Sequence, residues 1–365
     1  MKTKFWITAG VAGVLATFAA TSSLRAGDAI TVVSFGGAYT KSQVEGMHKP
    51  FTAKTGIAVN SVDYSGGLAE VKAQEETKNV TWDVVDLLPS DAVLGCNEGY
   101  FEKIDASTLP PAPDGTPATK DFISGTLADC GVGNIVWSTV MTINKSKFTG
   151  DAPASLMDFF DVKKFPQKRS MQKVPQNNLE WALMADGVPA SDVYKVLATK
   201  EGVDRAFKKL DTIKPFVSVW WTAGAQPPQL LASGEVAMAT AYNGRIFDAT
   251  QTDNQPFQII WDAQVWQYDL FGVLKGAPHA AEAMDFVKFA TSTQPLAAQA
   301  SWISYGPARN SSIPLIGKHW KTGIDMAPNM PTAPDNFKTA LQQDVQFWAD
   351  HQDELNERFS AWLAQ

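Results

Sequence analysis

Residues 241–273 of the chain, AYNGRIFDATQTDNQPFQIIWDAQVWQYDLFGV, contain two apolar, aromatic runs that carry opposite charges. Arg245 follows the run that ends at Tyr242, and Asp269 lies 24 residues later, within the second run. Two opposite charges set among aromatic side chains can form a buried ion pair, which would only support the fold. They can also hold the two ends of a small molecule that carries both charges. The function of the protein depends on which of these interpretations is correct.

On both sides of this stretch, short β-branched runs alternate with amphipathic runs, which predicts a mostly parallel α/β sheet. Ligands of such sheets bind beyond the carboxyl ends of the strands, where Phe35-Gly36-Gly37 and Leu88-Pro89-Ser90 lie in this chain. Residues 268–274 form a further apolar run that we expect to return to the first domain. The predicted strands are 29–34, 57–62, 82–88, 133–144, 216–221, 236–241 and 257–261. The predicted helices are 40–54, 68–77, 90–98, 155–160, 179–184, 191–198, 203–210, 227–233, 280–291 and 336–364.

The N-terminus has the layout of a secretory signal peptide. Lys2 and Lys4 precede an apolar run from Phe5 to Ala20, and Ala26 offers a small residue for cleavage. The apolar run is too short for a membrane anchor. Removing residues 1–26 takes away three cations and no anions, so the formal net charge changes from −7 to −10. An acidic chain without Lys/Arg runs is a poor partner for nucleic acid or anionic membranes, so we expect an exported, soluble protein.

Cys96 and Cys130 are the two cysteines of the chain. Export to an oxidising compartment predicts a disulfide between them. The bond would close a loop of about 34 residues, which is worth ~3 kcal/mol of stability if loop entropy is the source. The alternative is a pair of separate buried thiols.

Motifs for common catalytic and metal chemistry are absent from the sequence. None of the four histidines is paired at the spacing of metal ligands, and no Cys/His cluster occurs. The chain has no Gly-x-Ser-x-Gly elbow, phosphate-binding loop or dinucleotide fingerprint. We therefore expect no metal, no cofactor and no catalytic residue. The basic residues between Lys163 and Arg169 predict a solvated surface loop.

Several motifs follow one another in an order that resembles a known family. After the signal and the Phe-Gly-Gly turn come WDVVD at 82–86, NEGYFEKID at 97–105, LASGEVA at 231–237, YNGR at 242–245 and AAEAMDFVKFATS at 280–292. This order resembles the family-1 extracellular solute-binding proteins of ABC importers, in particular their putrescine/spermidine-binding branch. The resemblance covers nearly all of the chain beyond the signal.

The resemblance implies a two-lobed α/β protein of the type II periplasmic class, in which each lobe is a mostly parallel sheet flanked by helices. It places lobe 1 at residues 27–138 and 272–330, lobe 2 at residues 139–271, and a C-terminal helix at 331–365 that packs on the lobes. A ligand would bind in the cleft between the lobes and close it. The resemblance also implies a monomeric periplasmic protein that is not an enzyme and delivers its ligand to an inner-membrane ABC permease.

The chain departs from the polyamine-binding pattern at the positions that bind amines. Where the relatives carry an aspartate for one ammonium of the ligand, this chain has Arg245, while the second aspartate is retained as Asp269. The turn Phe35-Gly36-Gly37-Ala38 stands where the relatives have Trp-Ser-Asp-Tyr, so another acid is lost. A further acid of the relatives falls near Asn177. One end of the site has therefore changed the sign of its charge.

This pattern implies a ligand with an amine at one end and a carboxylate at the other, as in the γ-aminobutyrate-binding proteins of plant-associated bacteria. Arg245 can hold a carboxylate through two parallel hydrogen bonds, and Asp269 would bind the ammonium. Asp262 is a second candidate for the amine. The predicted ligand-binding residues are Arg245, Asp269, Tyr242, Trp221, Phe35, Gly36, Gly37, Gln267 and Tyr305.

Three other functions remain open at this point. A polyamine-binding protein would have the same fold, but Arg245 argues against it. A ferric-ion-binding relative would carry adjacent tyrosines, which this chain lacks. A secreted hydrolase is the more distant alternative, and a turnover assay on model esters and glycosides would identify it.

Overall fold

The structure is a computed structural model that describes Met1 and residues 29–365. Apart from Met1, the predicted signal peptide lies outside the described residues. Among the helices of the described part, none combines the length and the apolar character that crossing a membrane requires.

The strands are β1 Ile30–Ser34, β2 Val59–Asp63, β3 Val84–Leu87, β4 Leu127–Ala128, β5 Gly131–Asn144, β6 Arg169–Gln172, β7 Val217–Trp221, β8 Met238–Tyr242, β9 Phe257–Val273, β10 Gly306–Pro307 and β11 Leu341–Gln342. The helices are α1 Gly37–Gln43, α2 Lys49–Thr55, α3 Ala69–Thr77, α4 Pro89–Asn97, α5 Ala118–Asp121, α6 Leu156–Phe160, α7 Asn178–Ala185, α8 Val193–Leu197, α9 Lys200–Ile213, α10 Gln226–Ser233, α11 Asn243–Thr252, α12 Ala280–Ala290, α13 Thr293–Gln299 and α14 Val345–Leu363. A π-helical turn, Val44–His48, joins α1 to α2.

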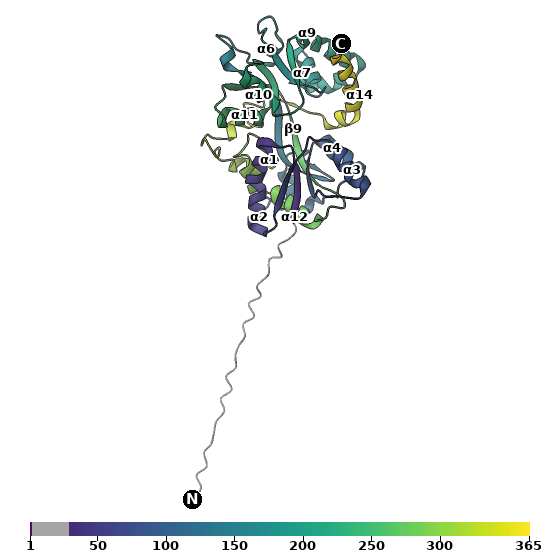
Figure 1. Ribbon diagram of the computed structural model, residues 1–365, viewed down its shortest axis with the longest axis vertical. Coiled ribbons are helices and arrows are strands. Elements are labelled where there is room, and N and C mark those ends of the chain that lie inside the picture. Colours follow the sequence, from purple (N-terminus) through teal and green to yellow (C-terminus); the bar gives the residue numbers. More distant parts are fainter. Residues whose placement is uncertain (2–28) are drawn as a thin grey trace.

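One sheet runs through the molecule in the strand order β2-β1-β3-β9-β5-β8-β6-β7. At one end β1 is parallel to β2 and β3, and at the other end β6 is parallel to β7 and β8. The long strands β5 and β9 pair antiparallel in the centre and connect the two halves of the molecule in Figure 1. The expected two-lobed α/β architecture is therefore confirmed, with parallel sheet in each half and an antiparallel centre.

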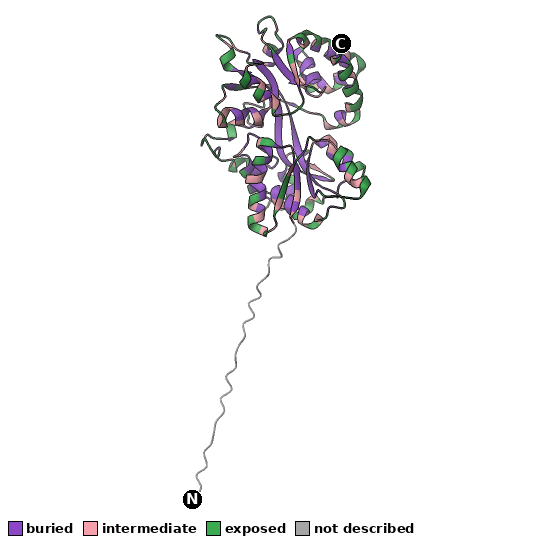
Figure 2. Cartoon of the chain, viewed as in Figure 1, coloured by how far each residue is buried: buried purple, intermediate pink, exposed green. Residues whose placement is uncertain are grey.

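Burial explains why these segments form these elements. All 14 residues of β5 are buried, as expected for a strand covered on both faces. Helix α9 is amphipathic: its buried side includes Val203, Phe207 and Leu210, spaced three or four residues apart. Figure 2 shows the same division for the whole molecule, with buried strands inside and helices that expose their outer faces. The two halves have separate apolar cores.

Most predicted elements are present, and the differences have local causes. The runs at 257–261 and 268–274 belong to a single strand, β9, which continues through Ala263 at a positive φ of 55°. The C-terminal helix begins at Val345 rather than near residue 336, because Leu341–Gln342 pairs with β9 instead. The short strand β6 was not predicted, since its sequence RSMQ has little apolar character.

The prediction of a solvated basic loop is wrong at Arg169. This residue is fully buried, and its guanidinium donates a hydrogen bond to the carbonyl of Phe165 at 2.6 Å and faces the ring of Phe159. The lysines of the loop are exposed, as predicted. Arg169 differs from them because it begins β6, whose position inside the sheet draws the side chain into the core.

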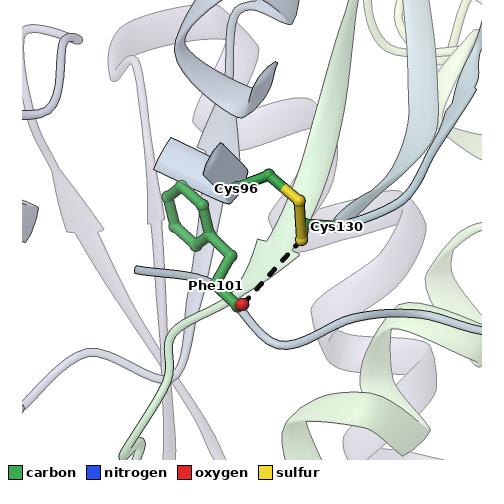
Figure 3. Close-up of a disulfide and its surroundings, with 3 residues drawn as sticks. All are labelled: Cys96, Phe101 and Cys130. Carbon is green, nitrogen blue, oxygen red and sulfur yellow. Dashed lines mark hydrogen bonds between the residues drawn. A yellow bond between two sulfur atoms is a disulfide. The ribbon is translucent and has the colours of Figure 1, made fainter. Parts of the chain in front are cut away.

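The predicted disulfide between Cys96 and Cys130 is present, with a Cα–Cα distance of 5.7 Å. It connects the end of α4 to the residue before β5 (Figure 3). The sulfur of Cys130 also lies 3.8 Å from the carbonyl oxygen of Phe101, a packing contact because a disulfide sulfur has no proton to donate. The bond ties the helix beside the cavity described below to the central strand pair.

Candidate functional site

A cavity of about 350 Å³ lies where the two halves of the molecule meet. Strands β5 and β9 and the segments that follow β1, β3 and β8 line it, together with the first part of α14. The carboxyl ends of β1 and β3 reach it, as the α/β pattern predicts. The predicted residues that line the cavity are Phe35, Tyr242, Arg245, Gln267, Asp269 and Tyr305.

Arg245 lies in the first turn of α11 and is half-buried. Its Nη2 donates to the carbonyl oxygens of Phe35 at 3.1 Å and Gly36 at 3.3 Å, whereas its Nε has no partner. Within the described residues it forms no ion pair. A cation near a helix N-terminus is disfavoured by the helix dipole. Helix stability therefore does not account for Arg245, and its charge is available to an anionic group in the cavity.

Asp269 approaches the same cavity from β9 and is 3% exposed. Its Oδ1 accepts a hydrogen bond from Nε1 of Trp137 at 2.6 Å. No cation pairs with it in the part of the chain that the structure describes. Burial, and next the charge of Asp86, raises the pKa of this carboxyl well above its ordinary value. A buried carboxylate without a counter-ion favours the binding of a cation.

The charges of Arg245 and Asp269 both affect the pKa values of Tyr242 and Tyr305. Burial raises the pKa of both phenols; the charge of Arg245 lowers it and the charge of Asp269 raises it. Arg245 and Asp269 nevertheless form no ion pair with each other. The two charges therefore face one cavity and share aromatic neighbours but do not neutralise each other.

Gly36 and Gly37 are not among the residues that line the cavity, although we predicted them as ligand contacts. Both have positive φ angles, 75° and 63°, at the start of α1. A Cβ atom at Gly37 would lie 2.6 Å from Nη1 of Arg245. Gly37 leaves room for the arginine, and the carbonyl oxygen of Gly36 accepts one of its hydrogen bonds.

Trp221 is also placed behind the cavity rather than on it. It is fully buried, donates from Nε1 to Oγ1 of Thr240 at 3.3 Å, and meets the Tyr242 ring edge to face. Trp137 occupies the position that we expected Trp221 to have. It lines the cavity and packs edge to face on the ring of Tyr242, with the ring centroids 5.0 Å apart. The sequence around Trp137, a mostly apolar strand, gave no signal that distinguished this tryptophan from a core residue.

The second candidate for the amine, Asp262, lies elsewhere. Its carboxylate accepts from the backbone N–H of Leu156 and from Oγ1 of Thr339, both at 2.9 Å, and it does not line the cavity. The sequence already ranked Asp262 below Asp269, because only Asp269 matches an amine-binding position of the polyamine-binding proteins that the chain resembles. Its role is to fix the start of α6.

Several polar residues that sequence reasoning missed also line the cavity. Gln172 donates to the hydroxyl of Tyr242 at 3.0 Å. Asp91, beside the predicted Leu88-Pro89-Ser90 turn, is half-buried, and burial raises its pKa to about 6. Asn177, near the position where the polyamine-binding relatives have an acid, has a positive φ of 66°. The other missed polar residues are Ser65, Gln176, Thr222, Gln343, Gln352 and Asn356.

Helix α14 completes the cavity wall. Trp348 of this helix lines the cavity and donates from Nε1 to Glu180 of α7 at 2.7 Å. Glu180 is fully buried, and burial raises its pKa to about 7. The described residues contain no group of three or more His, Cys, Asp or Glu side chains arranged to hold a metal ion. The arrangement is suited to holding a small molecule that carries both charges.

The chain is similar in sequence and fold to known solute-binding proteins. The chain matches the family described as bacterial extracellular solute-binding protein over residues 46–332. It is 42% identical to the γ-aminobutyric acid-binding protein of Pseudomonas aeruginosa over 347 residues, which cover 95% of this chain and 94% of that protein.

Two solved structures show similar folds. The binding protein MotA from A. tumefaciens B6, in complex with glucopine, has 30% identity and a TM-score of 0.81, and the match covers 92% of this chain and 99% of that one. The GABA receptor Atu4243 has 32% identity and a TM-score of 0.77, covering 93% and 98% of the two chains.

Proposed function

Since the chain belongs to the bacterial extracellular solute-binding protein family, we propose that it delivers γ-aminobutyrate, or a close ω-amino acid, to an ABC importer. In this role it works in the periplasm as a monomer, hands its ligand to an inner-membrane permease and catalyses no reaction. The name of the Pseudomonas relative and that of the solved GABA receptor support this ligand class.

One observation carries the proposal: Arg245 and Asp269 line the same cavity, and neither forms an ion pair within the described residues. The carboxylate of the ligand binds the guanidinium of Arg245, which offers two parallel N–H donors. The ammonium binds Asp269, where it supplies the cation that this buried carboxyl lacks. Tyr242 and Tyr305 contact the methylene chain between the two ends.

A diamine fits this arrangement less well. If one ammonium of putrescine occupies the Asp269 end, the other is directed toward Arg245, a like charge. Two cations brought together in a partly buried cavity repel each other, and this repulsion opposes the binding of a diamine. We therefore expect the protein to bind γ-aminobutyrate more tightly than putrescine.

The two lobes that hold the ligand are part of the proposal. Lobe 1 comprises residues 27–138 and 272–330, lobe 2 comprises residues 139–271, and residues 331–365 pack on them. The contacts of α14 support the last assignment: Trp348 and Phe359 belong to the apolar core that contains α7 and α9, and the helix also contacts α4.

Titration calorimetry with γ-aminobutyrate, β-alanine, 5-aminovalerate and putrescine tests the ligand. We expect γ-aminobutyrate to bind and Arg245→Ala to weaken its binding by about a hundredfold or more, because a charge-assisted pair is lost. Asp269→Asn should weaken it similarly. Asp262→Asn is the matched control, since it removes a carboxylate of the same strand outside the cavity. Unchanged affinity in Arg245→Ala would contradict the carboxylate assignment.

A further inference from the structure

A second carboxyl group lies behind Asp269, on the neighbouring strand. Asp86 of β3 pairs with Phe271 of β9 in antiparallel register, so Asp86 and Asp269 point to the same face of the sheet as diagonal neighbours. Asp86 is fully buried and does not line the cavity. It is therefore close enough to act on the ammonium site without touching a ligand.

Polar groups hold the Asp86 carboxyl in place, but none of them is a cation. Its oxygens accept from Gln43 Nε2 at 2.6 Å and from Ser34 Oγ and Asn134 Nδ2, both at 3.0 Å. Within the described residues, neither Asp86 nor Asp269 has an ion-pair partner. Two carboxyl groups placed side by side without a counter-ion cannot both remain ionised at low energetic cost.

The Tyr39 side chain supplies an independent sign that this place is incomplete. Tyr39 lines the cavity, is 3% exposed, and its hydroxyl has no well-aligned hydrogen-bond partner among the described residues. Burial raises the pKa of this phenol, and the charges of Asp86 and Asp269 raise it further. The hydroxyl therefore faces both carboxyl groups at the point where the ammonium is expected.

Building on the proposed function, we propose that Asp86 is the hidden second acid of the ammonium site. Together with Asp269 it retains one proton before the ligand binds, and this proton passes to solvent when the ligand's ammonium enters. Asp86 is a positioning residue, because it acts on the ligand through Asp269 and through its own charge. No bond other than the O–H bond of the carboxyl pair is broken.

The pKa shifts of Asp86, Asp269 and the groups around them agree with a carboxyl pair that retains one proton. Burial raises the pKa of Asp86 to about 6, although Tyr39, Gln43, Asn134 and Ser34 favour its charged form, and the pKa of Asp269 is raised further. The other titratable groups around the pair are Tyr39 of α1, Tyr64 after β2, Tyr242 of β8 and Tyr305 before β10. Two charged side chains also line the cavity: Arg245 of α11, and Asp91 of α4, whose pKa burial raises to about 6. The pKa of each of these tyrosines is raised, so all four stay neutral across physiological pH.

The sign of the pH dependence follows from these shifts. Because the ligand's positive charge favours the doubly ionised pair, binding releases a proton wherever the free pair still holds one. Affinity for γ-aminobutyrate therefore rises with pH, by up to about tenfold per pH unit, from about pH 6 until Asp269 ionises in the free protein. Below about pH 6 both carboxyl groups are protonated and affinity falls further.

Calorimetry of the protein with γ-aminobutyrate at pH 7, in phosphate, HEPES and Tris, measures this proton directly. We expect the observed enthalpy to change linearly with the ionisation enthalpy of the buffer, corresponding to release of up to one proton. In Asp86→Asn the affinity at alkaline pH falls by about tenfold or more, while the rise of affinity with pH levels off at lower pH because Asp269 has lost its charged neighbour and ionises more readily. Asp262→Asn keeps the wild-type proton release and profile.

Two results would overturn the inference. One is binding of γ-aminobutyrate without proton release between pH 6 and 8, a measurement that needs no variant. The other is an Asp86→Asn protein that is less stable but keeps the wild-type pH profile, as a purely structural residue would. If putrescine binds and γ-aminobutyrate does not, the ligand assignment is wrong and the proton measurement is made with putrescine. If neither amine binds, both proposals are wrong.

Discussion

At the scale of single residues, the site depends on how closely the backbone approaches Arg245. Gly37 leaves the space in which the guanidinium sits, and Gly36 contributes a carbonyl oxygen to it. The arginine was identified from the sequence because its charge differs from that expected in polyamine-binding relatives. Both glycines were predicted to contact the ligand, and the structure places Gly37 against Arg245, a side chain distant in sequence, where α1 packs against α11.

Gly37→Ala should therefore impair binding through Arg245. The new methyl group would lie 2.6 Å from Nη1, so the guanidinium has to shift from its present position, and we expect affinity for γ-aminobutyrate to fall by about tenfold. The positive φ adds a loss of stability of about 1 kcal/mol. Calorimetry and urea denaturation measure the two effects.

Gly99→Ala is the matched control for this prediction. Gly99 has a φ of +80°, and a Cβ atom there would meet nothing within 4 Å. The control should lose similar stability and keep its affinity. Equal affinities in both variants would show that Gly37 does not position Arg245.

At the scale of elements, the disulfide ties α4 to β5 beside the cavity (Figure 3). The sequence allowed this bond to be predicted from export and from the count of two cysteines. The structure adds its consequence, since α4 begins at the Leu88-Pro89-Ser90 turn, which contributes Leu88 and Ser90 to the cavity wall.

The double variant Cys96→Ser/Cys130→Ser should be less stable by ~3 kcal/mol, because a loop of 34 residues is no longer closed in the unfolded chain. Urea denaturation measures the loss, and the wild-type protein under reducing conditions should show the same shift. Affinity for γ-aminobutyrate should change less than about twofold, since neither cysteine lines the cavity. Loss of binding in a folded variant would instead show that the disulfide is needed to maintain the shape of the site.

Elements differed in how well the sequence identified them. Strands such as β3 and β5 were recognisable because most of their residues are apolar or β-branched, as is common in buried strands. Strand β6 and the full length of β9 were not, because Arg169 and Asp262 interrupt the apolar pattern with charges that only tertiary contacts satisfy. Local propensity does not contain that information.

At the scale of the whole molecule, β5 and β9 connect the two halves, and α14 contacts α4 beside the cavity (Figure 1). We expect γ-aminobutyrate to draw the halves together around these connections, because residues of both halves line the cavity, Phe35 and Tyr39 from one and Tyr242 and Arg245 from the other. Small-angle scattering should show a smaller radius of gyration with saturating ligand. Arg245→Ala at the same ligand concentration should show no compaction, and a wild-type protein that does not compact would contradict closure.

The sequence by itself determined the α/β class, the pairing of the two cysteines and the two charges of the proposed clamp. The first follows from local periodicity, the second from a count of possible partners, and the third from comparing residue types with those of the polyamine-binding proteins that the chain resembles. The tertiary structure decided that Trp137 rather than Trp221 lines the cavity, that Asp262 lies outside it, and that Asp86 stands behind Asp269. Each of these depends on strand register and on which face of the sheet is covered, and register is set by contacts between residues far apart in the chain.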